Sequence, residues 1–183
     1  MISSQARDGF RHFLEQAVKT SLANATPQCS LQSLPNLDTV KQKKTVVLTV
    51  ATYLFRVLVF MYFTPDQATS AYFARLNGCE ADAMSDQALI DAISECGNMC
   101  CGILNRELSA HFPHMGLSTP NIIDRRSAEY LDQLECGYIE HFSIDADEAV
   151  PLHLSLCVCE YADVDFKPDL TAAAETTGEL ELF

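Results

Sequence analysis

A chain of 183 residues with 48% apolar content is long enough to bury a core of its own, and its length is typical of one domain. The net charge of −13 and the pI of about 4.6 argue against nucleic acid and anionic membranes as partners, because those surfaces attract positive patches. The N-terminal residues lack the charged start and apolar core of a secretory signal, so the sequence predicts a cytoplasmic protein.

Eight cysteines are spread along the chain, and no two of them have the C-x-x-C spacing of a zinc knuckle or a thioredoxin-like redox site. In a cytoplasmic protein we expect these thiols to be reduced, so the sequence does not predict a disulfide framework. The eight are Cys29, Cys79, Cys96, Cys100, Cys101, Cys136, Cys157 and Cys159.

The first predicted element is an amphipathic helix over residues 4–23. Its apolar side chains recur at helical spacing and form one stripe, made of Phe10, Phe13, Leu14, Val18 and Leu22. The stripe covers either the chain's own sheet or a partner subunit, and the sequence favours neither. Residues 25–38, with two prolines and several small polar residues, are predicted to be a linker.

An apolar run over residues 45–64 is about as long as a membrane span. Arg56 lies in its middle, where a charge costs about 3 kcal/mol on membrane insertion, and the run is dominated by residues that suit a pleated sheet. We therefore expect two strands, 45–50 and 53–63, joined as a hairpin. The turn between them lacks the glycine that usually marks such a hairpin.

Two helices are expected next. Residues 64–66, Thr-Pro-Asp, offer a capping hydroxyl, a proline for the first helical position and an acid for the positive end of the helix dipole. Asn-Gly at 77–78 ends that helix near Leu76. Ser85 can cap a longer helix over residues 86–111, which ends before Pro113.

Three further strands are expected, over 115–123, 134–142 and 152–161, and the last alternates leucine and valine with histidine, serine and cysteine. The order is therefore one helix, two strands, two helices and three strands, which indicates an α+β fold with an antiparallel-rich sheet packed against long helices. We assign residues 1–162 to this domain and residues 163–183 to an acidic, flexible tail.

The helix over 86–111 has two different faces. At 100° per residue its apolar side chains gather on one side, namely Leu89, Ile93, Cys96, Cys100, Ile103 and Leu104. The opposite side carries Asp91, Glu95, Asn98, Gly102, Asn105 and Ser109. Simple solvation accounts for most polar helix faces. A glycine costs about 1 kcal/mol inside a helix, however, so Gly102 indicates a role other than helicity, such as close approach of another backbone.

This helix also carries a resemblance to a known family. The segment 91–123, DAISECGNMCCGILNRELSAHFPHMGLSTPNII, resembles the signature of the CheX/CheC/FliY phosphatases, in which Asp or Ser, then Glu-x-x-Asn, and then a distant proline recur. This chain supplies Asp91, Glu95, Asn98 and Pro120. The order of elements over residues 4–161 is similar to that of the family as well.

The resemblance implies a CheC-like fold and a phosphatase that acts on the aspartyl phosphate of a CheY-like response-regulator receiver. In that family the glutamate and asparagine enter the receiver's site, which itself holds the phosphate and Mg²⁺, so the chain needs no metal or cofactor of its own. Asn98 would orient the attacking water and Glu95 would pair with a receiver lysine. The residues expected to help docking are Asp91, Gly102, Asn105 and Pro120.

The chain departs from the family in three ways. It has one Glu-x-x-Asn helix where CheC-type proteins have two, which makes it CheX-like, with one site per subunit and an expected homodimer. Asp124 stands where many relatives have glycine, and the tail over residues 163–183 is extra.

Other functions are weighed on the same residues. A non-catalytic receiver-binding or flagellar-switch-like adaptor would keep the fold without hydrolysing phosphate. A metal or redox role for the thiols at 96, 100 and 101 is less favoured, because they lie on or beside the apolar stripe and buried thiols behave as small hydrophobes. His153, Cys157 and Cys159 share a strand face but lack a clear fourth ligand for zinc.

Overall fold

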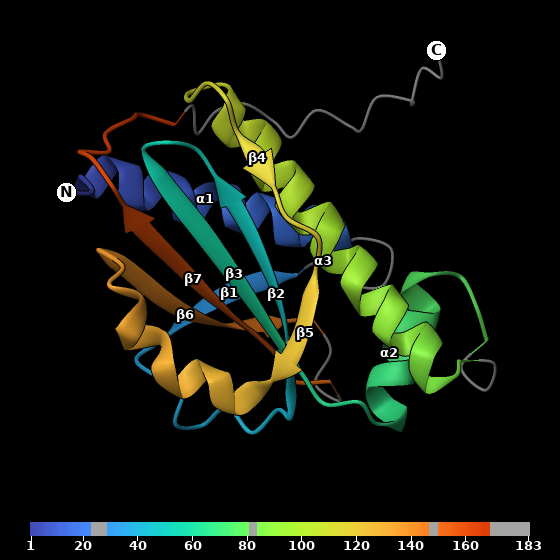
Figure 1. The fold of residues 1–183 in the computed structure, drawn as a ribbon. Helices are drawn as coiled ribbons and strands as arrows, with labels where there is room; N and C mark the ends of the chain where they lie inside the picture. Colours follow the sequence, from blue (N-terminus) through green and yellow to red (C-terminus); the bar gives the residue numbers. More distant parts are fainter. Residues whose placement is uncertain (23–28, 81–83, 147–149, 169–183) are drawn as a thin grey trace, which may run out of the picture.

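The computed structural model describes residues 1–22, 29–80, 84–146 and 150–168. Its elements form one sheet with helices on both faces (Figure 1). In chain order they are α1 (Ser4–Leu22), β1 (Ser30–Leu34), β2 (Lys44–Ala51), β3 (Phe55–Phe63), α2 (Gln67–Leu76), α3 (Asp86–Ser109), β4 (Gly116–Leu117), β5 (Asn121–Asp124), the 3-10 helix η2 (Arg125–Leu134), β6 (Tyr138–Asp145) and β7 (Leu152–Glu160). The predicted α+β class is confirmed.

The sheet is antiparallel at each pairing of the described strands, in the order β1-β6-β7-β3-β2-β4, with β5 also paired to β2. The predicted hairpin is confirmed as β2 and β3, with Lys44 opposite Phe63 and Ala51 opposite Arg56. The turn between the two strands, residues 52–54, contains no glycine. It is closed by a hydrogen bond that Thr52 N donates to Phe55 O at 2.9 Å.

Strands β2 and β3 together account for the apolar run that is as long as a membrane span. In β3 the side chains alternate between faces: Val57, Val59 and Met61 pack with α1 and α3, whereas Phe60 and Tyr62 pack under η2. A strand covered on both faces carries apolar residues at nearly every position. Within the described ranges, no helix has the length and hydropathy that a membrane span requires.

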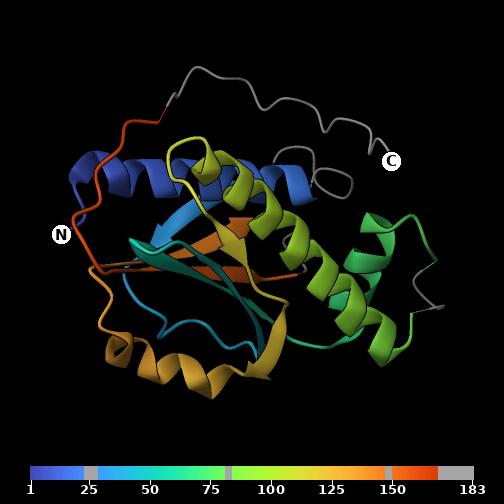
Figure 2. The same cartoon turned by 45° about the horizontal axis from the view of Figure 1, so that its top comes forward.

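Helices α1 and α3 lie together on one face of the sheet, and η2 covers the other (Figures 1 and 2). The apolar stripe of α1 is buried within its own chain, since Phe10, Leu14 and Leu22 are fully buried there. Of the two interpretations of this stripe, the structure therefore supports cover for the chain's own core.

Two features of the sheet and one helix were not predicted. Strand β1 lies in the segment expected to be a linker, where it pairs with β6 from Ser30 opposite Asp145 to Leu34 opposite His141. The strand expected over 115–123 is divided into β4 and β5, with Pro120, which has no N–H to donate, between them. The region before β6 forms η2, a polar segment that buries only Ala128 and Leu131.

Helix ends follow capping chemistry, with one correction. The predicted cap Ser85 is confirmed, since its hydroxyl accepts from Ala88 N at 3.2 Å. The predicted start of α2 at Thr64 is wrong: Asp66 is the cap, and its Oδ1 accepts from Thr69 N at 2.9 Å. Both residues can cap, and the first turn selects the one whose side chain reaches the N–H three residues on.

Residues 163–168 continue beyond the predicted domain boundary as a packed segment. Val164 forms a parallel bridge with Ile2, and Phe166, 8% exposed, packs on Phe10 and Phe13 of α1. Gly9 makes room for it, because a Cβ there would lie 2.6 Å from the Phe166 ring. The rest of the predicted tail lies outside the described residues.

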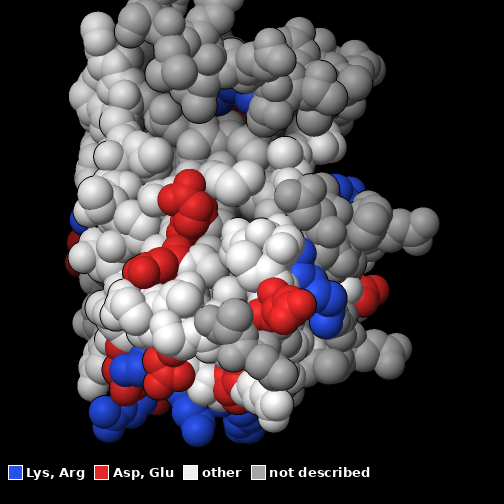
Figure 3. All heavy atoms as spheres, turned by 90° about the vertical axis from the view of Figure 1, so that its right-hand side faces the viewer, with Lys and Arg blue, Asp and Glu red and all other residues white. Residues whose placement is uncertain are grey.

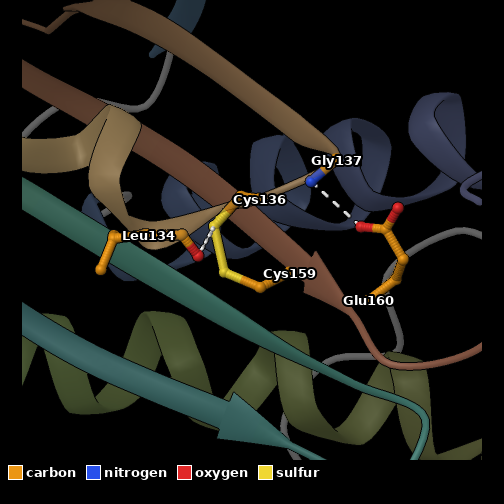
Figure 4. Close-up of a disulfide and its surroundings, with 5 residues drawn as sticks. All are labelled: Leu134, Cys136, Gly137, Cys159 and Glu160. Atoms are coloured by element: carbon orange, nitrogen blue, oxygen red, sulfur yellow. Dashed lines mark hydrogen bonds between the residues drawn. A yellow bond between two sulfur atoms is a disulfide. The ribbon is translucent and has the colours of Figure 1, made fainter.

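Cys136 and Cys159 are joined by a disulfide, so the expectation that all cysteines are reduced is wrong for this pair (Figure 4). Cys136 follows Glu135, the left-handed residue that ends η2, and Cys159 lies near the end of β7. Next to the bond, Gly137 N donates to Glu160 Oε2 at 3.0 Å (Figure 4). The bond thus ties the end of η2 to the sheet. Spacing could not indicate it, because the β6–β7 pairing brings the two thiols together.

Candidate functional site

Helix α3 is held close to strand β2 by a glycine on its inner face. A Cβ at Gly97 would lie 2.9 Å from Leu48 Cδ1 and 3.5 Å from Val46 Cγ1. The lack of a side chain therefore lets the helix settle onto β2, and its opposite side faces outward. Sequence reasoning missed Gly97, although a glycine on the apolar side of a long helix signals such an approach.

Glu95 and Asn98 lie together on the outward side of α3. Glu95 is exposed and Asn98 is half-buried, and Asn98 Nδ2 donates to Glu95 Oε2 at 3.5 Å. This distance is at the outer limit of a hydrogen bond, so the carboxamide can take a stronger partner. The Asn98 amide is thus directed to the outer face, beside a carboxylate, and not into the sheet.

The structure places most of the predicted docking residues along the same side. Asp91 is exposed and accepts from Gln87 Nε2 at 2.8 Å. Above Gly102 there is open space, because a Cβ there would meet nothing within 4 Å. Asn105 is half-buried, and its Oδ1 has no hydrogen-bond partner among the described residues. The face therefore offers a carboxylate, a carboxamide and an uncovered stretch of backbone.

Met99 belongs to this face, and sequence reasoning missed it. Its side chain is 46% exposed, which is high for a large apolar residue. It lies one turn from Glu95 and one turn from Gly102, so the three form neighbouring positions on the helix surface. The signal was an apolar residue at a polar position of the helical pattern. We name Glu95, Asn98, Met99 and Gly102 the α3 face.

Pro120 lies apart from the helix, in the link between β4 and β5. Strand β4 contacts α3 and pairs with β2, with Val50 opposite Leu117 (Figures 1 and 2). The link is held to the sheet by Ser118, which donates its N–H to Thr49 O and accepts from Thr49 N, both at 2.9 Å. The structure thus places Pro120 on the sheet edge, on the segment that follows the strand beside α3.

The side of the molecule that carries α2 and α3 has scattered acids and few cations, while Lys and Arg gather at its lower margin (Figure 3). On α3 the acids Asp91 and Glu95 lie on the outward side, and the helix's one cation, Arg106, is paired with Glu107 at 2.8 Å. A partner for this face should therefore offer positive charge near Glu95.

The cysteines of α3 belong to the buried core. Cys96, Cys100 and Cys101 are buried, and burial raises the pKa of Cys96 and of Cys101 to about 12 and that of Cys100 well above its usual value. Thiols with such pKa values remain protonated and unreactive at neutral pH. They serve as small apolar side chains of the core, as the stripe predicted.

The zinc alternative on β7 is short of ligands. Cys159 is in the disulfide, which leaves His153 and Cys157 on this strand face, and burial raises the pKa of Cys157 to about 12. In the part of the chain that the structure describes, no group of three His, Cys, Asp or Glu side chains could hold a metal ion.

Comparison with known proteins identifies the fold of this chain through solved structures. No protein-family model and no curated protein sequence matches the chain. Among solved structures, it is similar to a chain of the CheX–CheY–BeF3–Mg²⁺ complex from Borrelia burgdorferi, with 15% identity over 84% of this chain and 99% of that chain and a TM-score of 0.62. It is also similar to the chemotaxis protein CheX from Vibrio vulnificus, with 11% identity over 81% of this chain and 98% of that chain and a TM-score of 0.60.

A third similar structure is a chain of the FliM–SpeE complex from H. pylori, with 9% identity over 86% of this chain and 89% of that chain and a TM-score of 0.54. At these identities the comparisons carry the arrangement of elements and not the chemistry. The chain has the fold of the CheX and CheC-like proteins.

Proposed function

We propose that this chain binds a CheY-like receiver domain through the α3 face and promotes hydrolysis of the receiver's aspartyl phosphate. The observation that carries the proposal is the placement of Glu95 and Asn98 side by side on the outer surface of a long helix, beside the open backbone at Gly102. The structural likeness to a CheX–CheY complex supports a receiver as the partner.

The proposed chemistry needs only positioning. An aspartyl phosphate is hydrolysed when a water lies in line with the phosphorus, and a neutral carboxamide can hold that water without adding negative charge near the phosphoryl oxygens. Asn98 is such a group, and its long contact to Glu95 leaves it free to take the water. In this proposal the receiver supplies the phosphate and Mg²⁺, and this chain supplies the water's orientation.

Glu95 and Met99 are proposed to position the partner. Glu95 is exposed, so its carboxylate can pair with a cation of the receiver, and its place one turn from Asn98 would set how deeply the carboxamide enters. Met99 offers a flexible apolar contact beside it, a side chain suited to irregular partner surfaces. Gly102 then admits the partner's backbone where any other side chain would stand.

The competing proposal is a binding protein of the same fold that does not hydrolyse phosphate. Its support is the likeness to a chain of the FliM–SpeE complex, which shows the fold in an assembly of another kind. The two proposals differ in the lifetime of the receiver's phosphate. A phosphatase shortens this lifetime, whereas an adaptor leaves it unchanged or extends it.

The test is to measure the decay of phosphorylated CheY-like receivers from the same organism with the full chain present. We expect wild type to shorten the lifetime, and Asn98→Ala to lose most of this effect while it binds the beryllofluoride-activated receiver nearly as well. Gln133→Ala is the matched control, since it removes an exposed side-chain amide from η2, on the opposite face of the sheet, and should leave the lifetime as wild type does. Unaltered turnover in Asn98→Ala would refute the role assigned to this residue.

The homodimer expected from the resemblance is part of this proposal. Because the apolar stripe of α1 is buried against its own chain, a dimer would use a surface other than this stripe. Sedimentation of the full chain over a concentration series tests it: a constant monomer mass excludes the dimer and leaves the proposed chemistry intact, because the α3 face lies within one subunit.

A further inference from the structure

A cavity of about 500 Å³ lies between residues 37–42 and the first turns of η2. Val40 and Ala128, two of its lining residues, belong to the apolar cluster under η2, on the opposite face of the sheet from α1 and α3. The cavity is therefore separate from the α3 face. Its apolar wall is Leu37, Val40 and Ala128, and its polar lining includes Lys41, Gln42 and Arg125.

Two of these polar residues, Gln42 and Arg125, each have a buried side-chain atom with no hydrogen-bond partner among the described residues. Gln42 is 6% exposed; its Nε2 donates to Pro151 O at 2.8 Å, but its Oε1 has no partner among the described residues. Arg125, with a side chain 19% exposed, donates Nη2 to Leu37 O at 3.0 Å, while its Nε has none. Unpartnered buried polar atoms are rare in folded proteins, so a buried acceptor and a donor at one cavity need an explanation.

The cavity also lies where the chain concentrates its positive charge. Five of the 12 Lys and Arg residues fall within two short segments that meet here, 41–44 and 125–126, in a chain with a net charge of −13. In Figure 3, Lys and Arg gather at the lower margin of the molecule, with acids among them. Arg126 is paired with Asp124 at 3.0 Å, so the lysines and Arg125 carry the local positive charge that attracts anions.

Two acids line the same cavity and set how an anion would enter. Glu129 Oε1 is 3.7 Å from Arg125 Nη1, and the Glu129 side chain is 60% exposed, so it can turn into solvent when a ligand takes its place. Asp38 contributes its backbone oxygen, which accepts from Lys41 Nζ at 2.9 Å. Of the two acids, Glu129 therefore competes with an anion for Arg125.

From these contacts we propose that the cavity between residues 37–42 and η2 binds a small hydroxylated organic anion. Its phosphate or carboxylate head would lie between Arg125 and Lys41, a hydroxyl would donate to Gln42 Oε1, and its short carbon body would rest on Val40 and Ala128. A fork-shaped guanidinium suits either head group, since both present paired oxygens.

The test is calorimetric titration of the full chain with glycerol 3-phosphate and with glycerate, which distinguish the two head groups, and with glycerol, which lacks the charge. We expect saturable binding of at least one of the two anions and none of glycerol. Lys41→Ala should weaken that binding about tenfold, the loss of one charged contact, and Glu129→Gln should strengthen it by removing the competing carboxylate.

Lys43→Ala is the matched control, because it removes the same charge from the neighbouring exposed lysine, which does not line the cavity. It should bind as wild type does. The proposal is overturned if neither anion binds wild type, or if Lys43→Ala weakens binding as much as Lys41→Ala, which would indicate general charge attraction. Both lysines are exposed, so their removal leaves the folded core intact.

Discussion

Gly97 and Leu48 meet at the contact between α3 and β2, where a Cβ on residue 97 would lie 2.9 Å from Leu48 Cδ1. Leu48 is fully buried, so its side chain has little room to move away. The contact determines how closely α3 approaches the sheet. It thereby determines how far Glu95 and Asn98, on the other side of the same helix, project from the protein surface.

Substitution at the two glycines of α3 should have opposite effects. Gly97→Ala should lower the free energy of unfolding by about 1 kcal/mol, because overpacking against Leu48 costs more than the gain in helix propensity. Gly102→Ala should raise it by about 1 kcal/mol, since nothing lies within 4 Å of the new Cβ. Urea unfolding of the two variants measures both. Stabilisation by Gly97→Ala would show that the helix is not held as described.

The same pair separates stability from docking. If the α3 face binds the receiver, Gly102→Leu should leave the chain folded and weaken receiver binding, because the new side chain occupies the space of the partner's backbone. Met99→Gln, similar in length but polar, should weaken binding by a smaller factor. Titration with beryllofluoride-activated receiver measures the affinities. Equal affinity of wild type and Gly102→Leu would place the interface elsewhere.

Loss of the disulfide should destabilise the chain. The disulfide closes a loop with a sequence separation of 23 residues. By lowering the conformational entropy of the unfolded chain, such a crosslink raises the free energy of unfolding by about 3 kcal/mol. Urea unfolding of wild type with and without dithiothreitol should therefore show a difference of this size, and the double variant Cys136→Ser, Cys159→Ser should show none. A reductant effect that persists in the double variant would assign it to another pair.

The segment over residues 163–168 should contribute to stability although it follows the predicted domain. Phe166→Ala removes a ring packed against Phe10, Phe13 and Phe112, and should cost about 3 kcal/mol. A chain that ends after Pro168 should unfold as the full chain does, whereas one that ends after Ala162 should lose the contribution. Thermal unfolding of the three chains distinguishes the predicted boundary from the packed one.

Stability should fall with pH below the ordinary pKa of histidine. Burial lowers the pKa of His141, whose Nδ1 lies 2.7 Å from Ser155 Oγ, and it also lowers the pKa of His153. As pH falls below about 6.5 the unfolded chain takes up these protons before the folded chain does, so the free energy of unfolding declines. Above that pH the unfolded chain does not take up these protons, and the free energy of unfolding keeps its full value.

Unfolding at pH 7.5 and pH 6.0 measures this decline, a range in which ordinary carboxylates remain ionised. His141→Gln retains a polar side chain near Ser155 and should reduce the difference between the two pH values. An unchanged difference in this variant would assign the dependence to other groups, His153 first.

The sequence determined the elements whose own residues contain the signal. The hairpin of β2 and β3 was predicted because its β-branched and aromatic residues suit a sheet wherever they lie, and the cap at Ser85 because its hydroxyl satisfies a local N–H. The spacing of Glu95 and Asn98 likewise places them one turn apart on any α-helix. These outcomes rest on interactions between near neighbours in the chain.

Contacts between distant segments were decided only by the tertiary structure. Strand β1 exists because β6 offers it a partner more than a hundred residues later, and Cys136 meets Cys159 only through the pairing of β6 with β7. The distance at which α3 packs on the sheet depends on the contact with Leu48, and the cavity exists only where residues 37–42 meet η2. A sequence pattern shows which face of its own helix or strand a side chain occupies. Which residue packs against that face depends on how distant segments of the chain fold together.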